Sequence, residues 1–120
     1  DIPNAPKPVG SYSQAILNND TLYISGQIPL NPVSQKLELD SIEKATKQVM
    51  SNIKALLNAA GMTTENVVKC SIFLKNMDDF AEVNKVYSSY FTGTFPARET
   101  VQVAKLPLDV SIEISCIASK

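Results

Sequence analysis

Apolar residues at every second position near the C-terminal end constrain the fold of this chain most strongly. Val101 and Val103 alternate with polar neighbours, and residues 112–116 repeat the pattern with Ile, Ile and Cys. A two-residue period is typical of strands that bury one face, so two strands are predicted here. The connection between them, residues 105–109, contains Pro107, which fits a connection better than a central strand. A sheet with one buried face needs a covering layer from the rest of the chain.

The residues upstream predict three more strands and two helices. Apolar residues recur at helical spacing over 41–60, and Asp40 and Glu43 have the spacing of a capping box at its start. A second helix, capped by Asp78, is predicted to run to about residue 91. The three upstream strands, of which the first two form a hairpin, are predicted over 12–17, 22–28 and 67–75. The predicted order is therefore β-β-α-β-α-β-β, an α+β fold with two helices on one face of the sheet.

A chain of 120 residues suits one domain over residues 1–120 and is too short for two ordinary ones. The sheet face without helices would carry Tyr23, Val67 and Phe73 among small polar residues. A monomer would leave much of that surface in water. We therefore expect an oligomer that packs sheet edges or faces together.

Two charged residues stand out in the C-terminal region. Arg98 follows Phe95-Pro96-Ala97 at a strand entrance, and Glu113 lies in the middle of an apolar strand. The simplest interpretation is that Arg98 is a surface charge or half of a surface ion pair and that Glu113 faces solvent. In the alternative interpretation, Arg98 holds a ligand carboxylate through two parallel hydrogen bonds, while Glu113 handles a proton or a water molecule.

The chain contains no histidine, so the commonest metal ligand and the commonest general base are absent. Acid–base chemistry would have to come from carboxylates, Tyr, Lys, Cys or water, and Glu113 is the candidate that stands out. Ser25 lacks the usual activating histidine of a hydroxyl nucleophile. Cys70 and Cys116 fall at core positions of predicted strands. We interpret them as buried thiols that act as small apolar residues, because the sequence shows no spacing typical of a disulfide framework or a metal site.

The net charge of −1 and the sequence pI of about 5.3 argue against a nucleic-acid partner. No apolar run approaches the roughly 20 residues of a membrane span. No signal peptide is visible, so a cytoplasmic location is expected. The chain begins at Asp1 and not at Met, and an organelle is the alternative if a targeting segment was removed.

Short motifs recur along nearly the whole chain. The C-terminal part contains FPAR at 95–98, VQVAKLP at 101–107 and IEI at 112–114. Upstream lie GSYSQ at 10–14, ISGQIP at 24–29 and FAEVN at 80–84. In this order and spacing the motifs resemble those of the reactive-intermediate deaminase family, also called RidA or YjgF. Glu99 is a difference, because the residue after the motif arginine is usually small in this family.

The resemblance implies a chorismate-mutase-like fold assembled as a homotrimer, with three clefts at the subunit interfaces. It also implies a hydrolase without a cofactor, a 2-iminobutanoate/2-iminopropanoate deaminase that converts reactive imines and enamines into 2-oxo acids and ammonium. By match to the motifs, Glu113 and Arg98 are the catalytic residues. The substrate-binding residues would be Tyr12, Ser25, Gly26, Asn84, Arg98 and Thr100. Tyr12 would lie over the ligand, Asn84 would come from across the interface, and Thr100 would make its contact through the backbone.

Other interpretations stay open. The same cleft could bind or sense small carboxylates such as 2-oxo acids without turnover, although a pure carboxylate binder gains nothing from Glu113 nearby. Some family members are linked to RNA cleavage and inhibition of translation, against which the acidic pI and the lack of a basic aromatic face count. A chaperone-like role is also described for the family. Asn84, finally, could simply satisfy nearby backbone groups.

Overall fold

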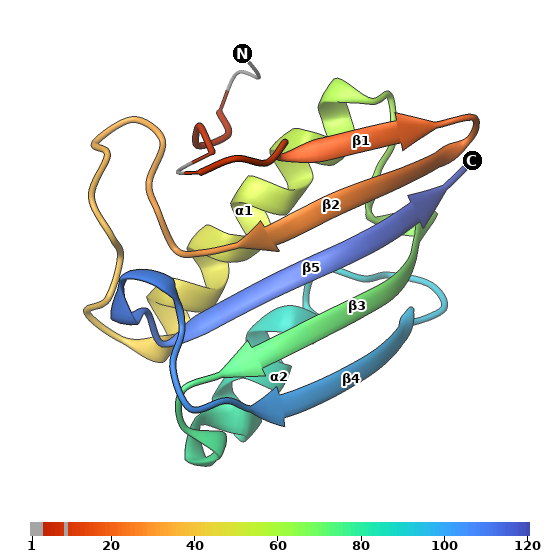
Figure 1. Cartoon of the computed structure of the whole chain (residues 1–120). Helices are drawn as coiled ribbons and strands as arrows, with labels where there is room; N and C mark the ends of the chain where they lie inside the picture. The colour runs from red at the N-terminus through yellow and green to blue at the C-terminus, as the bar shows by residue number, and fades with distance from the viewer. Residues whose placement is uncertain (1–3, 9) are drawn as a thin grey trace.

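The computed structural model describes residues 4–8 and 10–120, and its centre is a five-stranded sheet (Figure 1). The strands lie in the order β1-β2-β5-β3-β4. Their bounds are β1 Ala15–Asn18, β2 Thr21–Gln27, β3 Val67–Leu74, β4 Ala97–Gln102 and β5 Ile112–Ser119. The helices are α1 Ile42–Ala59 and α2 Phe80–Ser88. β3 and β4 are parallel and are joined through α2, whereas the other neighbouring strands are antiparallel. The predicted α+β class and element order are confirmed.

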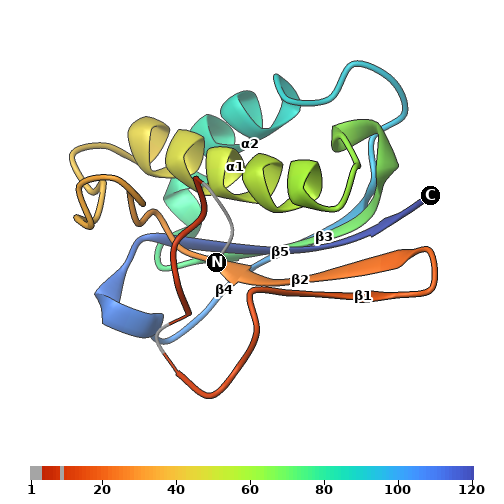
Figure 2. The same ribbon diagram turned by 90° about the horizontal axis from the view of Figure 1, so that it is seen from above.

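Both helices cover the same face of the sheet (Figure 2). Alternate side chains of β5 follow the two-residue period, so that Ile112 and Ile114 are buried beneath the helices while Glu113 lies on the opposite face. The apolar stripe of α1, including Val49, Ile53 and Leu56, completes the core from above. We call the sheet face without helices the open face. It carries Tyr23, which is 47% exposed, and Phe73, as predicted from the sequence.

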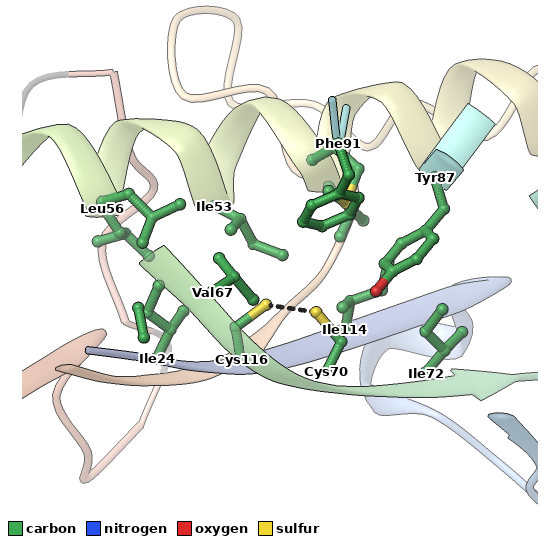
Figure 3. Close-up of a cluster of buried hydrophobic side chains, with 14 of the residues drawn as sticks. Ile24, Ile53, Leu56, Val67, Cys70, Ile72, Tyr87, Phe91, Ile114 and Cys116 are labelled. Carbon is green, nitrogen blue, oxygen red and sulfur yellow. Dashed lines mark hydrogen bonds between the residues drawn. The ribbon is translucent and has the colours of Figure 1, made fainter. Parts of the chain in front are cut away.

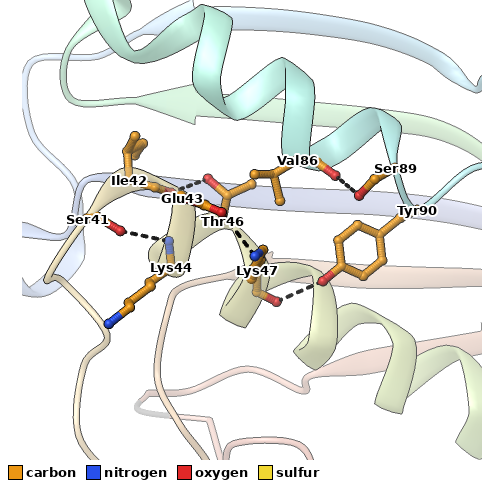
Figure 4. Close-up of polar contacts among 9 residues, drawn as sticks. All are labelled: Ser41, Ile42, Glu43, Lys44, Thr46, Lys47, Val86, Ser89 and Tyr90. Carbon is orange, nitrogen blue, oxygen red and sulfur yellow. Dashed lines mark hydrogen bonds and ion pairs between the residues drawn. The ribbon is translucent and has the colours of Figure 1, made fainter.

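Ser41 caps the start of α1. Its hydroxyl accepts a hydrogen bond from Lys44 N at 3.1 Å, so the capping residue is Ser41 and not the predicted Asp40 (Figure 4). One turn later Thr46, which is buried, donates to Ile42 O at 2.7 Å. Tyr90 Oη lies 3.5 Å from Lys47 O, which ties the segment after α2 to α1. The first two contacts stabilise the start of α1, and the third links the two helical segments.

A bulge at Val68 changes the predicted faces of β3. The pairing with β5 shifts between Val67 and Lys69, so one extra residue enters the strand. Val67 therefore points into the core and is 6% exposed, whereas Val68 points outward and is 50% exposed. The sequence pattern predicted the opposite for Val67. After the bulge, Cys70 and the following alternate residues face the core as predicted.

Two predicted elements are shorter than expected. β1 begins at Ala15, so Tyr12 lies in the loop before it and not in a strand. Before α2, residues Met77–Asp79 form a 3-10 turn that is capped by Asn76, whose side chain accepts from Asp78 N at 2.9 Å. Asp78 is therefore not the cap of the helix. Within the described residues, no helix is long and apolar enough to cross a membrane.

Candidate functional site

Arg98 lies on β4 with its side chain on the helix-covered face. It is the neighbour of Cys70 in the parallel β3–β4 pair, and Cys70 faces the core. Arg98 Nη1 donates a hydrogen bond to Asn84 Oδ1 at 2.7 Å. The guanidinium carbon lies 5.1 Å from the centre of the Tyr87 ring and 5.5 Å from that of Phe80. Such cation–π contacts and the amide hold the guanidinium in one place.

Helix α2 supplies all three of these partners from one face. Phe80, Asn84 and Tyr87 are spaced four and then three residues apart, which stacks their side chains along one side of a helix. The sequence singled out Asn84 but neither Phe80 nor Tyr87. Their spacing from Asn84 is the signal that could have placed them beside the arginine.

A pocket of about 370 Å³ opens beside Arg98 and is lined by Asn84, Tyr87, Ser88, Phe95, Pro96 and Arg98. Among the described residues, Arg98 forms no ion pair with a carboxylate. A half-buried guanidinium that is fixed in position and not neutralised is suited to hold a ligand carboxylate. Thr100 lies two residues along β4 on the same face, and its hydroxyl is buried without a hydrogen-bond partner in the described part of the chain.

Glu99 points to the open face, away from this pocket. Its carboxylate forms an ion pair with Lys69 Nζ at 3.0 Å and accepts a hydrogen bond from the Ser71 hydroxyl. The bond from Ser71, together with Lys69, lowers the pKa of Glu99. The larger residue after the motif arginine is thus held by β3 and leaves the space around Arg98 unchanged.

Glu113 forms the centre of a second cluster, on the open face. Burial raises the pKa of its carboxyl, which is only half-buried there. The side chain lies against Gly26 of β2 so closely that a Cβ on Gly26 would be 2.6 Å from Cδ and 2.9 Å from Cγ of Glu113. The β2–β5 pairing is irregular between Ile24 and Gln27, and Gly26 occupies this stretch.

Ser25 and Tyr12 extend the second cluster toward the N-terminal loop. Ser25 Oγ donates to Ser13 O at 2.6 Å, which fixes the loop that carries Tyr12. Tyr12 is 45% exposed and lines, together with Gly26, a small pocket of about 20 Å³. The carboxyl of Glu113 and the ring of Tyr12 are therefore associated with the same short stretch of β2.

The two clusters do not meet within one chain. Arg98 shares a face with Cys70 and Cys116, which are buried beneath the helices, while Glu113 is three residues before Cys116 and lies on the opposite face. Arg98, Asn84 and Thr100 thus form one half of the predicted site, and Tyr12, Ser25, Gly26 and Glu113 form the other. The described residues contain no group of three or more His, Cys, Asp or Glu side chains that could hold a metal ion.

Comparisons with known proteins place this chain in a family. It matches the model of the family described as Endoribonuclease L-PSP over residues 2–120. A RutC family protein of Pyrococcus horikoshii is 50% identical over 117 residues, covering 98% of this chain and 93% of that protein. A Bos taurus protein named 2-iminobutanoate/2-iminopropanoate deaminase is 45% identical over 114 residues, covering 95% of this chain and 83% of that protein.

The fold agrees with this assignment. The crystal structure of the YjgF gene product of E. coli matches with a TM-score of 0.93 at 41% identity, covering 98% of this chain and 94% of that one. The sequence motifs, the family model and the fold all indicate the same family. The chain therefore belongs to the Rid/YjgF family of proteins.

Proposed function

We propose that this protein is a 2-imino acid deaminase that hydrolyses imines such as 2-iminobutanoate and 2-iminopropanoate. The observation that carries the proposal is Arg98, a guanidinium fixed by Asn84 and two aromatic rings beside an open pocket, with no carboxylate partner in the described part of the chain. A 2-imino acid offers a matching carboxylate next to its C=N bond. The activity named for the bovine relative is consistent with this chemistry.

The separation of the two clusters bears on how such an enzyme would be assembled. One subunit would supply Arg98 and a neighbouring subunit Glu113, because the sheet stands between them in a single chain. β4 is an edge strand, and the open face carries the exposed Tyr23 and the partly buried Phe73, so both are available for contact with another copy. We therefore propose a homotrimer with a cleft at each subunit interface and no bound cofactor.

In the proposed reaction Arg98 holds the substrate carboxylate in a bidentate contact. A water molecule adds to the imine carbon, and the ionised form of Glu113 accepts its proton. The protonated form of Glu113 then donates this proton to the amino nitrogen of the carbinolamine. The C–N bond breaks and ammonia leaves as the carbonyl forms, and the proton of the former hydroxyl group passes through the ionised Glu113 to the ammonia, which becomes ammonium. With a protonated imine as substrate, the net reaction is iminium plus water giving a 2-oxo acid and ammonium.

Modest catalysis is sufficient for this reaction, since imines already hydrolyse rapidly in water. Lowering the barrier by about 3–4 kcal/mol gives an acceleration of a few hundred-fold. Positioning of the substrate and one proton relay are able to supply that much. The raised pKa of Glu113 moves the titration of its carboxyl toward neutral pH. This suits a residue that accepts a proton and then returns it.

A coupled assay tests the proposal. An amino-acid oxidase or a pyridoxal-phosphate dehydratase generates the imine, semicarbazide traps what remains, and the purified protein is added at low concentration. Semicarbazone formation should fall with the wild type, stay high with Arg98→Ala, and stay high with Glu113→Gln although that variant still binds the 2-oxo acid. No effect of wild-type protein with several imino acids would refute deaminase activity.

A second candidate function is binding of small carboxylates without turnover. The specific observation is that the arginine pocket, including Asn84, Tyr87 and Phe95, is complete within one chain and does not involve Glu113. Titration calorimetry with 2-oxobutanoate distinguishes the two candidates: binding that depends on Arg98, without any turnover in the coupled assay, would favour the binder. The net charge of −1 and the absence of histidine give no support to RNA as the substrate.

A further inference from the structure

Cys70 and Cys116 are in direct contact in the core, although 46 residues separate them in the sequence. Their Sγ atoms lie 3.2 Å apart, and both residues are buried, with 0% and 4% of their surface exposed (Figure 3). Both thiols are free. The sequence predicted two buried thiols that act as small apolar residues, and the register of β3 against β5 is what brings them together.

The backbone around the pair has the geometry of a cross-strand disulfide. Cys70 and Cys116 are directly opposite each other in the antiparallel β3–β5 pair. Residues in that relation have Cα atoms about 4.5–5.5 Å apart, which falls within the range that a disulfide spans. Closing the bond therefore needs an approach of the two sulfur atoms by roughly 1 Å, and no movement of the strands.

The two thiols differ in their electrostatic surroundings. The hydrogen bond from Cys116 lowers the pKa of Cys70, and the hydroxyl of Tyr87 and the charge of Arg98 act in the same direction against the effect of burial. The same hydrogen bond and burial raise the pKa of Cys116 well above its usual range. Cys70 is thus the sulfur with more thiolate character, which is the nucleophilic form.

The arginine pocket and the thiol pair share one neighbour, Tyr87. Tyr87 lines that pocket. Its buried hydroxyl forms no hydrogen bond that meets the usual distance and angle limits in the described part of the chain. It nevertheless lies close enough to Cys70 for each group to affect the pKa of the other. Tyr87 is thus the side chain that connects the pocket with the thiol pair. Oxidation of this buried pair requires a reagent small enough to pass beside the ring, and hydrogen peroxide has that size.

We propose that Cys70 and Cys116 form an oxidisable pair that hydrogen peroxide converts into a disulfide between β3 and β5. The thiolate of Cys70 attacks one peroxide oxygen, which forms a sulfenic acid and releases hydroxide. Cys116 then attacks Cys70 Sγ, the S–S bond forms, and water leaves. In total two thiols are oxidised by two electrons and one peroxide is reduced to two water molecules.

The test is a count of thiols by mass spectrometry. Reduced wild-type protein is treated with hydrogen peroxide, denatured and alkylated with N-ethylmaleimide. We expect both alkylation sites to be lost together, with a non-reduced digest that joins the Cys70 and Cys116 peptides within one chain, and both sites to return after treatment with a reductant.

Single variants provide matched controls. In Cys116→Ala, Cys70 should accumulate as sulfenic or sulfinic acid, because no second thiol is present to resolve it; Cys116→Ser serves if the alanine variant does not fold. The double variant Cys70→Ala/Cys116→Ala separates cysteine oxidation from methionine oxidation. The proposal is overturned if wild-type thiols stay alkylatable at peroxide concentrations that oxidise Met77, the partly buried methionine at the start of the turn before α2. It is overturned equally if one cysteine is oxidised without the other, or if the cross-link joins two chains.

Discussion

Replacing Gly26 with alanine inserts a methyl group where the Glu113 side chain now lies. The new Cβ would be 2.6 Å from Cδ of Glu113, whereas ordinary contacts between such atoms are about 3.5 Å. The backbone itself tolerates alanine, because Gly26 is not in the left-handed region, unlike Gly61. The Glu113 carboxylate must therefore move by about 1 Å, or β2 must shift against β5.

A displacement of this size has a definite expected cost. Misplacing a catalytic group by about 1 Å lowers the rate roughly hundredfold, which corresponds to about 2.7 kcal/mol in the barrier. Stability should fall by only about 1–3 kcal/mol, the usual cost of overpacking, and by less if the half-exposed Glu113 side chain rotates into solvent. Arg98 is on the other face of the sheet, so carboxylate affinity should not change.

The assay is the coupled imine reaction, with kcat and KM measured for Gly26→Ala in the wild-type and in the Glu113→Gln background. We expect a drop in kcat with unchanged KM in the first background and no further drop in the second. Full activity of Gly26→Ala would refute the reasoning. So would an equal loss in both backgrounds, because the effect would then not pass through Glu113.

Three more predictions concern the two clusters. Arg98→Lys loses the bidentate geometry and should weaken binding of 2-oxobutanoate about 10- to 100-fold, measured by calorimetry, with an unchanged melting temperature. Tyr87→Leu removes the ring beside the guanidinium and should weaken the same binding a fewfold, whereas Tyr87→Phe keeps the ring and should bind as the wild type does. Glu113→Gln should raise the melting temperature at neutral pH. Burial favours the protonated carboxyl, so the contribution of Glu113 to stability is present below about pH 4.5 and is lost as pH rises through its raised pKa; the advantage of the variant should vanish in acid.

Periodicity along single segments predicted the elements well. The apolar spacing over 41–60 gave α1 almost to the residue, and the alternation over 112–116 gave the start of β5, which continues to Ser119. Both patterns are set by one element packing on one core. The bulge at Val68 was missed, since an added residue breaks the alternation at one point only and resembles ordinary irregularity.

The relations between segments were harder to predict. Which face of the sheet Arg98 and Glu113 occupy depends on the register of β3 against both β4 and β5, and no local spacing encodes a register. The contact between Cys70 and Cys116 follows from the same register. The motif resemblance singled out the candidate site residues but gave no indication of which face of the sheet each of them occupies.

The position of β5 has a consequence for how the chain folds during synthesis. β5 is the last strand in sequence, yet it lies between β2 and β3 and is the strand that joins the two halves of the sheet (Figure 1). The hairpin with α1, and the β3–α2–β4 unit, can each form early on the ribosome. Neither has its central neighbour until β5 has left the exit tunnel, so the inner edges of β2 and β3 are unpaired until then. A nascent chain stalled before residue 112 would expose both edges at once, and unpaired strand edges are the sites at which such chains aggregate.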